Sequence, residues 1–238
     1  MKILVTGHEG FIGSHVSEHL TSLGYTVDGL SFPDDIGDFK GGDYGLVVHL
    51  AAFANIRGSL DNPDVFWENN VEKSKPLFEW CRQTNTRILY ASSSSVHEWW
   101  INPYAITKKV NEVQAPPNSV GMRFYNVWAE KDSRSDMLYR MLQDKTAFYL
   151  TRHRRDWIHV HDVARAICYL IPDKFRGVLD IGTGTNHSVL ELAMKMGKSD
   201  LPIVDDTPGE PDSLCADISI LTKMGWSPTI NILDFASP

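Results

Sequence analysis

A tyrosine and a lysine four residues apart, Tyr104 and Lys108, are the pair in this chain best suited to acid-base chemistry. They follow the turn Asn102-Pro103, after which we expect a helix. Positions four apart share one face of a helix, so the ammonium group of Lys108 would lie near the phenol of Tyr104. A free tyrosine has a pKa near ~10, but a neighbouring cation favours its phenolate. The pair therefore predicts a tyrosine that transfers protons near neutral pH.

Three glycines, Gly7, Gly10 and Gly13, follow an apolar stretch at residues 2–6. Gly7 permits a tight turn out of a strand, Gly10 lets the backbone approach a pyrophosphate, and Gly13 allows a helix to pack closely on the sheet. The amino end of that helix attracts phosphate. Glycine triplets also occur for steric reasons alone. Together with the tyrosine and lysine, this one predicts a nicotinamide oxidoreductase.

Short apolar strands alternate with helical patterns along the chain. We expect strands at 2–6, 25–30, 46–50, 87–91, 119–124 and 177–181, and helices at 11–23, 64–84, 103–114, 135–144 and 161–171. This alternation predicts an α/β fold with a Rossmann-type, doubly wound parallel sheet and a small C-terminal substrate lobe. We expect the Rossmann domain at residues 1–126, completed by about 157–182, and the lobe at 127–156 and 183–238.

Composition and charge exclude several classes of function. The 238 residues are 42% hydrophobic and 22% charged, which is ordinary for one sizeable core plus a small lobe. We see no membrane-spanning run and no signal peptide, so we expect a cytoplasmic protein without a membrane partner. The net charge of -7 disfavours nucleic-acid binding. The three cysteines are far apart, which argues against disulfides, and we expect no metal site.

Eight motifs occur in a fixed order. They are Thr6-Gly7-x-x-Gly10-x-x-Gly13, His49-Leu50-Ala51-Ala52, the serines 92–95, Tyr104-x-x-x-Lys108, Arg123-Phe124-Tyr125-Asn126-Val127, the segment 155–164, Gly182-Thr183-Gly184, and Gly225-Trp226-Ser227-Pro228. With these motifs the chain resembles the extended short-chain dehydrogenase/reductase superfamily, and within it the nucleotide-sugar epimerase/dehydratase family. The resemblance runs nearly end to end.

The resemblance implies a catalytic group of Ser93, Tyr104 and Lys108. Counting back from Val96 aligns Ser93 with the family serine whose hydroxyl binds the reacting sugar oxygen, although serines also end strands and cap turns. Tyr104 would remove or return the hydroxyl proton while hydride passes to or from the nicotinamide, and Lys108 would bind the nicotinamide ribose. Dehydratases, decarboxylases and epimerase-reductases of the family carry extra reactive groups at positions 94 and 95, where this chain has serines. The resemblance therefore leaves simple oxidation and reduction at C4 of the sugar as the expected reaction.

The resemblance also implies NAD as the cofactor, with NADP left open, and a nucleotide-diphosphate sugar as the substrate. Ser31 replaces the usual ribose-binding acid, and Asp35-Ile36 is similar to the family's adenine contact. The expected cofactor-binding residues are Gly7, Gly10, Phe11, Ile12, Ser31, Asp35, Ile36, Leu50, Ala51, Ala52, Tyr104 and Lys108. The expected substrate-binding residues are Arg57, Ser93, Asn126 and Arg155. A solvent-exposed Arg57 and a surface ion pair of Arg155 with Asp156 are the alternatives.

The sequence thus predicts an NAD(P)-dependent nucleotide-sugar epimerase. Two alternatives stay open: a reductase or dehydrogenase acting on the same sugars, and a dinucleotide-binding protein with weak turnover. The retained serine, tyrosine and lysine favour an enzyme. Shortened segments, among them the loop from Ser93 to Tyr104, and Thr207 at the position of a family arginine favour the binding protein. A homodimer is left open, because the shortened helix after Lys108 belongs to the four-helix interface that family members commonly form.

Overall fold

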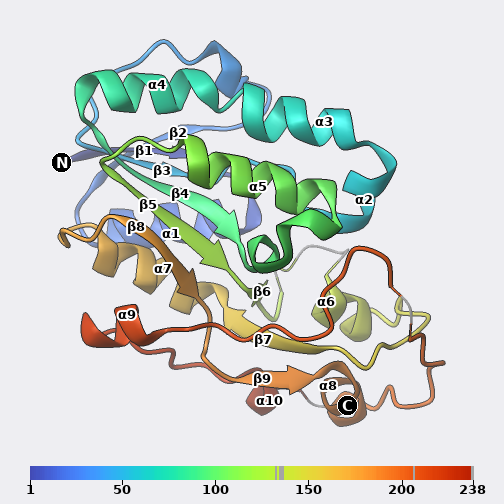
Figure 1. The fold of residues 1–238 in the computed structure, drawn as a ribbon. Helices are drawn as coiled ribbons and strands as arrows, with labels where there is room; N and C mark the ends of the chain where they lie inside the picture. The colour runs from blue at the N-terminus through green and yellow to red at the C-terminus, as the bar shows by residue number, and fades with distance from the viewer. Residues whose placement is uncertain (132, 134–136, 206, 237–238) are drawn as a thin grey trace.

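A parallel sheet of six strands forms the centre of the molecule (Figure 1). The computed structural model describes residues 1–131, 133, 137–205 and 207–236. The strands, in their order across the sheet, are β2 (Thr26–Leu30), β1 (Lys2–Thr6), β3 (Leu46–His49), β4 (Arg87–Ser93), β5 (Ser119–Phe124) and β8 (Gly177–Ile181). Every neighbouring pair is parallel, which confirms the predicted doubly wound α/β fold.

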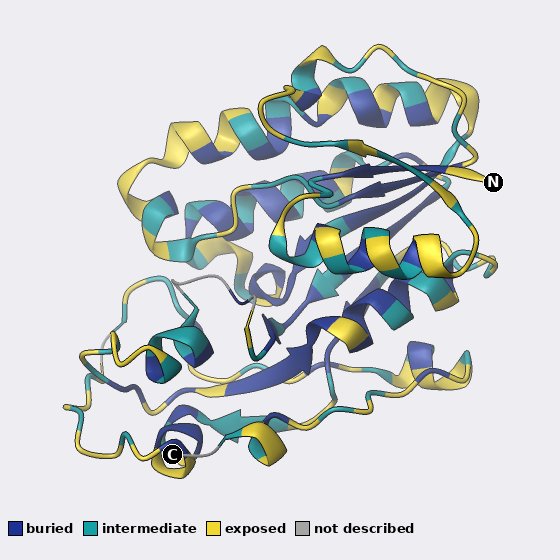
Figure 2. Cartoon of the chain, turned by 180° about the vertical axis from the view of Figure 1, so that it is seen from behind, coloured by how far each residue is buried: buried dark blue, intermediate teal, exposed yellow. Residues whose placement is uncertain are grey.

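Helices cover both faces of this sheet (Figure 1). On one face α1 (Phe11–Ser22) packs against α7 (Val160–Leu170), and the other face carries α3 (Pro63–Trp67), α4 (Lys75–Thr84) and α5 (Pro103–Gln114). A sheet covered in this way requires strands that are apolar on both sides, and all four residues of β3 are buried. Figure 2 shows this burial across the central strands. No described helix has the length and apolar character needed to cross a bilayer.

The single helix predicted at 64–84 is interrupted. A π-helical turn, η2 (Glu68–Glu72), separates α3 from α4. Within this turn the side-chain amide of Asn70 accepts from the backbone N–H of Phe53 (2.8 Å) and donates to the hydroxyl of Thr107 (3.1 Å). Such π turns are rare overall and are frequent at functional sites. The interruption therefore ties the helix to the loop after β3 and to α5.

A second, smaller sheet lies beside the first. It consists of β6 (Asn126–Trp128), β7 (Arg154–His159) and β9 (Asn186–Ser188), with α6 (Leu138–Gln143), α8 (Val189–Lys195) and α10 (Ile232–Phe235) as its nearby helices. The short helix α9 (Ser219–Lys223) packs instead in the core of the main sheet, through the buried Leu221. Residues 135 and 136 of the helix predicted at 135–144 lie outside the described residues. A separate hydrophobic cluster joins Trp128, Leu150, Trp157, Leu192 and Ile232. The two-part substrate lobe stays a prediction, and this cluster is in keeping with it.

The topology directs several loops to one edge of the main sheet. From β1 the chain passes outward to β2 and then returns to β3 on the other side of β1, so the loops after β1 and β3 diverge at the carboxyl ends of the strands. Ligands of open parallel sheets bind at such a switch point. Short elements follow the other strand ends: η1 (Ile36–Asp38) after β2, α2 (Ile56–Asp61) after β3, and η3 (Ser94–Ile101) after β4.

Candidate active site

A cavity of about 1180 Å³ opens at this edge, between the main sheet and the smaller sheet. The sequence-predicted residues that line it are Gly7, Gly10, Phe11, Ile12, Leu50, Ala51, Ala52, Arg57, Ser93, Tyr104, Lys108, Asn126 and Arg155. They come from both sheets and from loops that are far apart in the sequence. A shallower groove of about 610 Å³, beside α1 and α7, contains none of the predicted site residues.

The glycine turn after β1 has two packing glycines and one open glycine. Gly7 has a φ of +73°, and a Cβ there would lie 2.8 Å from the backbone nitrogen of Ala51. A Cβ on Gly13 would lie 1.9 Å from the carbonyl oxygen of Gly7. A Cβ on Gly10 would meet only that oxygen, at 3.1 Å, and among the described residues no side chain caps α1 at this end. The unpaired N–H groups at the start of α1 therefore border the cavity, as a pyrophosphate site requires.

The residues predicted for the adenosine end of the cofactor do not line the cavity. Ser31 bonds through its hydroxyl to Nδ1 of His8 (2.9 Å). Asp35 forms an ion pair with Lys73. Ile36 is buried in the hydrophobic cluster beneath α4. All three have partners within the protein, and their contact with a cofactor stays a prediction.

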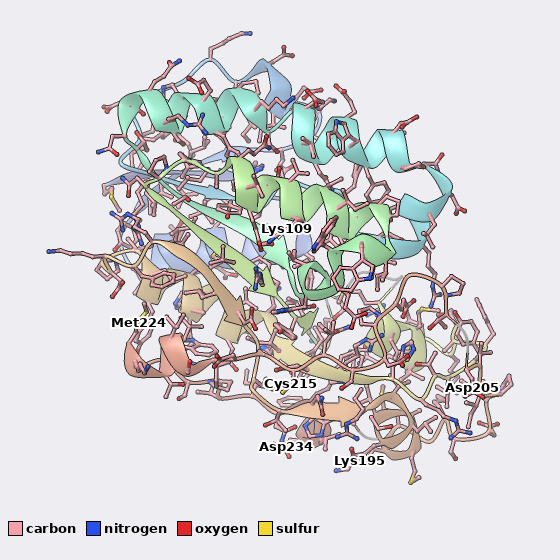
Figure 3. All side chains as sticks on the ribbon, viewed as in Figure 1. Lys109, Lys195, Asp205, Cys215, Met224 and Asp234 are labelled. Atoms are coloured by element: carbon pink, nitrogen blue, oxygen red, sulfur yellow. The ribbon has the colours of Figure 1, made fainter. Side chains whose placement is uncertain are left out.

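Helix α5 brings Tyr104 and Lys108 to the same cavity wall. Asn102 caps the helix, its side chain accepting from the N–H of Ala105 (2.7 Å). The ammonium nitrogen of Lys108 lies 5.8 Å from the centre of the Tyr104 ring and donates to the carbonyl of Ala91 (3.1 Å). Figure 3 labels the next residue, Lys109, on the same helix. The spacing of four thus produces the proximity that the sequence predicted.

Burial sets the protonation behaviour of Lys108 and of the histidine beside it. Lys108 is 3% exposed, and this burial lowers its pKa to about 8. His49 is also buried, and burial together with the charge of Lys108 lowers the pKa of His49 to about 3. The His49 ring bonds to the hydroxyls of Thr6 (2.7 Å) and Ser74 (3.1 Å). His49 is therefore neutral near pH 7, and Lys108 is a cation that loses its charge at a lower pH than an ordinary lysine.

We expect Lys108→Met to raise the stability of the cofactor-free protein at neutral pH. The native fold must bury an ammonium group there, and a methionine of similar length removes that cost. Burial lowers the pKa of Lys108 to about 8 in the folded protein, whereas a lysine in the unfolded chain keeps a pKa near ~10.4. Between these two pH values the folded protein loses the proton before the unfolded chain does. The free-energy cost of burying the charge therefore falls as the pH rises from about 8 to about 10.4. Thermal unfolding of both proteins at neutral pH and near pH ~10 measures this. A stability difference that stays constant with pH would contradict it.

The serine run both caps a turn and supplies a hydroxyl to the cavity. Ser93 ends β4 and accepts from the N–H of Ser95 (3.2 Å), so it caps η3. It is 7% exposed and lines the cavity. Ser92 donates instead to Glu112 (2.7 Å), which also binds Arg123 (2.8 Å). Serines 92–95 all line the cavity, and the Ser93 hydroxyl donates to that of Ser95 (3.2 Å). A catalytic role of Ser93 stays a prediction.

The sequence analysis missed a hydrogen-bonded cluster around Tyr125, which also lines the cavity. Its hydroxyl donates to Asp180 (2.8 Å), and Nε2 of His97 lies 3.4 Å from the other oxygen of that carboxylate. Burial, reinforced by the charge of Asp180, raises the pKa of Tyr125 above its usual value. Tyr125 is thus a protonated tyrosine that joins β5, β8 and η3. Its place inside the motif 123–127 was the available signal.

The arginine side of the cavity is built around a carboxylate that was not predicted. Arg155, on β7, is 7% exposed and donates to Nδ1 of His153 (2.7 Å) and to Glu210 (3.5 Å). Arg57 binds the other oxygen of Glu210. Burial lowers the pKa of Arg155, and the charge of Glu210 opposes that shift. A surface pair of Arg155 with Asp156 is not found, since Asp156 accepts backbone N–H groups such as that of Gly184 (2.9 Å).

Comparison with known proteins connects this cavity with a family. A family model described as "NAD dependent epimerase/dehydratase family" matches residues 3–182. A putative UDP-glucose 4-epimerase of Methanocaldococcus jannaschii is 28% identical, over 97% of this chain and 94% of that protein. That alignment spans 290 residues against the 238 of this chain, in keeping with the shortened segments. Protein CapI of Staphylococcus aureus is 28% identical, over 72% of this chain and 69% of that protein.

Solved structures share the fold over almost the whole chain. The structure described as MoeE5 in complex with UDP-glucose and NAD is 25% identical, with a TM-score of 0.84 over 98% of this chain and 95% of that one. The recognition of the family and of a Rossmann fold is thereby confirmed. The prediction of NAD as cofactor is confirmed at the level of the family, whose description names it.

Proposed function

Because the chain belongs to the NAD dependent epimerase/dehydratase family, we propose that it interconverts nucleotide-diphosphate sugars by oxidation and reduction at C4. One observation carries the proposal: Ser93, Tyr104 and Lys108 line a single cavity, which has the glycine turn in one wall and Arg155 in another. The similarity to a putative UDP-glucose 4-epimerase supports C4 as the reacting carbon.

The cavity fits a dinucleotide at its pyrophosphate and nicotinamide ends. Gly10 has no side chain to fill the space before the start of α1, and among the described residues no side chain caps the N–H groups there. Lys108 and Tyr104 would hold the ribose next to the nicotinamide. NAD, when bound, supplies the hydride acceptor and donor.

Three side chains would handle the proton of the sugar hydroxyl. Ser93 would donate to or accept from the C4 oxygen and hold it beside Tyr104. The phenol of Tyr104 would take the proton during oxidation and return it during reduction. Lys108, 5.8 Å from the ring centre and cationic at neutral pH, would favour the phenolate form. These roles use only groups that line the same cavity.

The diphosphate of the substrate would lie at the opposite wall. Asn126 begins β6 there, and Arg155 presents a planar guanidinium that can bind two phosphate oxygens. A chain that is 25% identical has been described in complex with UDP-glucose and NAD, which supports a sugar nucleotide as the ligand class.

We expect Arg155→Gln to weaken sugar-nucleotide binding by roughly tenfold or more, because a charge-assisted contact to phosphate is lost. Affinity for NAD should be nearly unchanged, since NAD is assigned to the glycine turn. Calorimetric titration of UDP-glucose and of NAD measures both. Arg152→Gln is the matched control, because Arg152 pairs with the exposed Asp205 outside the cavity. Equal losses for both ligands would refute the assignment.

The proposed reaction is tested by incubating the protein and NAD with UDP-, GDP-, dTDP- and ADP-sugars and analysing the products by NMR. A 4-epimer supports the proposal. A net change in NADH without an isomer identifies the reductase or dehydrogenase, and no change in any sugar favours the binding protein with weak turnover.

A further inference from the structure

Two arginines from distant parts of the chain hold one carboxylate at the cavity wall. Arg57, on α2, donates to Oε1 of Glu210 from Nε (3.2 Å) and from Nη2 (3.0 Å). Arg155, on β7, approaches Oε2 of the same carboxylate at 3.5 Å. All three side chains line the cavity of the candidate active site. The carboxylate of Glu210 therefore marks a position where an anion is bound by two guanidinium groups.

The neighbours of the two arginines hold both guanidinium groups in place beside Glu210. Nδ1 of His153 accepts from Arg155 at 2.7 Å, so the imidazole is neutral and orients the guanidinium. Arg57 lies over the ring of Tyr149, 5.5 Å from its centre. Stacking and a neutral histidine hold both cations without cancelling their charge. Among the hydrogen-bond partners within the described residues, Glu210 is the one that Arg57 and Arg155 share.

We propose that Arg57 and Arg155 form a two-guanidinium clamp for the substrate's diphosphate, and that Glu210 closes this clamp until the ligand displaces it. This rests on the proposed function, since it takes a sugar nucleotide as the ligand. With Glu210 in place the clamp carries one net positive charge. A diphosphate diester carries two negative charges, so it matches the two arginines once the carboxylate has left. Arg57, expected from the sequence to bind substrate, is thereby assigned to the diphosphate.

The backbone around Glu210 allows its side chain to leave. Glu210 ends a turn in which its N–H donates to the carbonyl of Thr207 (3.1 Å), after Gly209 with a φ of +79°. From Asp212 onward the chain is fixed by pairing with β7. The amide of Asn102, which caps α5, donates to the carbonyl of Gly209 (2.9 Å). A rotation of the Glu210 side chain is sufficient to open the clamp, and the turn itself contacts the start of the helix that carries Tyr104.

The clamp is tested by calorimetric titration of inorganic pyrophosphate and of UDP into protein saturated with NAD, which keeps the glycine turn occupied. Glu210→Gln keeps the shape of the side chain and removes its charge, so it should bind both probes about tenfold more tightly. Arg57→Gln should bind both about tenfold more weakly. When Glu210→Gln is combined with Arg57→Gln, the gain in affinity from Glu210→Gln should be smaller than in the native background. The reason is that one of the two guanidinium groups freed by the loss of the carboxylate is absent.

The control is the ion pair of Arg152 and Asp205, which is exposed and lies outside the cavity; Figure 3 labels Asp205 at the rim of the molecule. Asp205→Asn should leave both affinities unchanged. Weaker or equal binding by Glu210→Gln, native affinity in Arg57→Gln, or no binding by any variant would overturn the clamp. These readouts need no turnover. Native binding behaviour with no sugar converted would contradict the epimerase proposal and leave the clamp intact.

Discussion

Tyr104→Phe is expected to lower turnover of the correct sugar nucleotide roughly 100- to 10,000-fold, the usual contribution of a positioned acid-base group. The substitution removes only the hydroxyl. The ring should keep its edge contact with Phe66, at 6.5 Å between centres, and its buried position in α5. Affinity for NAD should therefore be nearly intact, and the loss should appear in kcat more than in KM. Native turnover by this variant would refute the role of Tyr104.

Tyr125→Phe is the matched control for that experiment. It removes a second hydroxyl from the wall of the same cavity, but this hydroxyl donates to the buried carboxylate of Asp180 (2.8 Å). Loss of that bond leaves Asp180 with one partner fewer, which costs about 1–3 kcal/mol. We expect a lower Tm and a much smaller loss of turnover than for Tyr104→Phe.

Gly10→Val is expected to abolish detectable NAD binding while the protein still folds. The φ of Gly10 is -72°, which any residue adopts, and the first added carbon meets only one backbone oxygen at 3.1 Å. The remaining methyl groups would fill the space where the pyrophosphate must approach the start of α1. Calorimetry with NAD and thermal unfolding measure the two effects. Native NAD affinity in this variant would show that the cofactor binds elsewhere.

Gly13→Ala separates packing from binding in the same turn. Its Cβ would lie 1.9 Å from the carbonyl oxygen of Gly7, so the backbone must move. We expect a loss of stability of about 1–3 kcal/mol or more, as for other overpacked sites. A fall in Tm for Gly13→Ala and not for Gly10→Val would distinguish the two glycines.

Features set by short-range spacing could be predicted from the sequence. Tyr104 and Lys108 meet because four residues make about one helical turn, and Asn102-Pro103 starts that helix. The glycine turn follows from a strand that passes directly into a helix. The central strands β1 and β3 carry continuous apolar runs, because helices cover both of their faces.

Features set by pairing across the fold could not be predicted. Glu210 meets Arg57 across 153 positions of sequence, and nothing local to either residue indicates the contact. Strand β7 was missed because Arg154–His159 is rich in charged residues whose burial depends on partners elsewhere, such as the N–H groups that bind Asp156. The break at η2 arises from bonds of Asn70 to residues on two other segments. Each depends on tertiary contacts that a sequence pattern does not contain.

The most direct test of C4 chemistry uses a sugar nucleotide that carries deuterium at C4, incubated with the protein and NAD and followed by proton NMR. If hydrogen passes from C4 to bound NAD and returns from it to the same carbon, the 4-epimer should form with its deuterium retained. Tyr104→Phe should form this product far more slowly from the same substrate. An epimer that has exchanged its C4 deuterium for solvent hydrogen, an isomer changed at another carbon, or no change in any sugar of the four nucleotide classes would contradict the account.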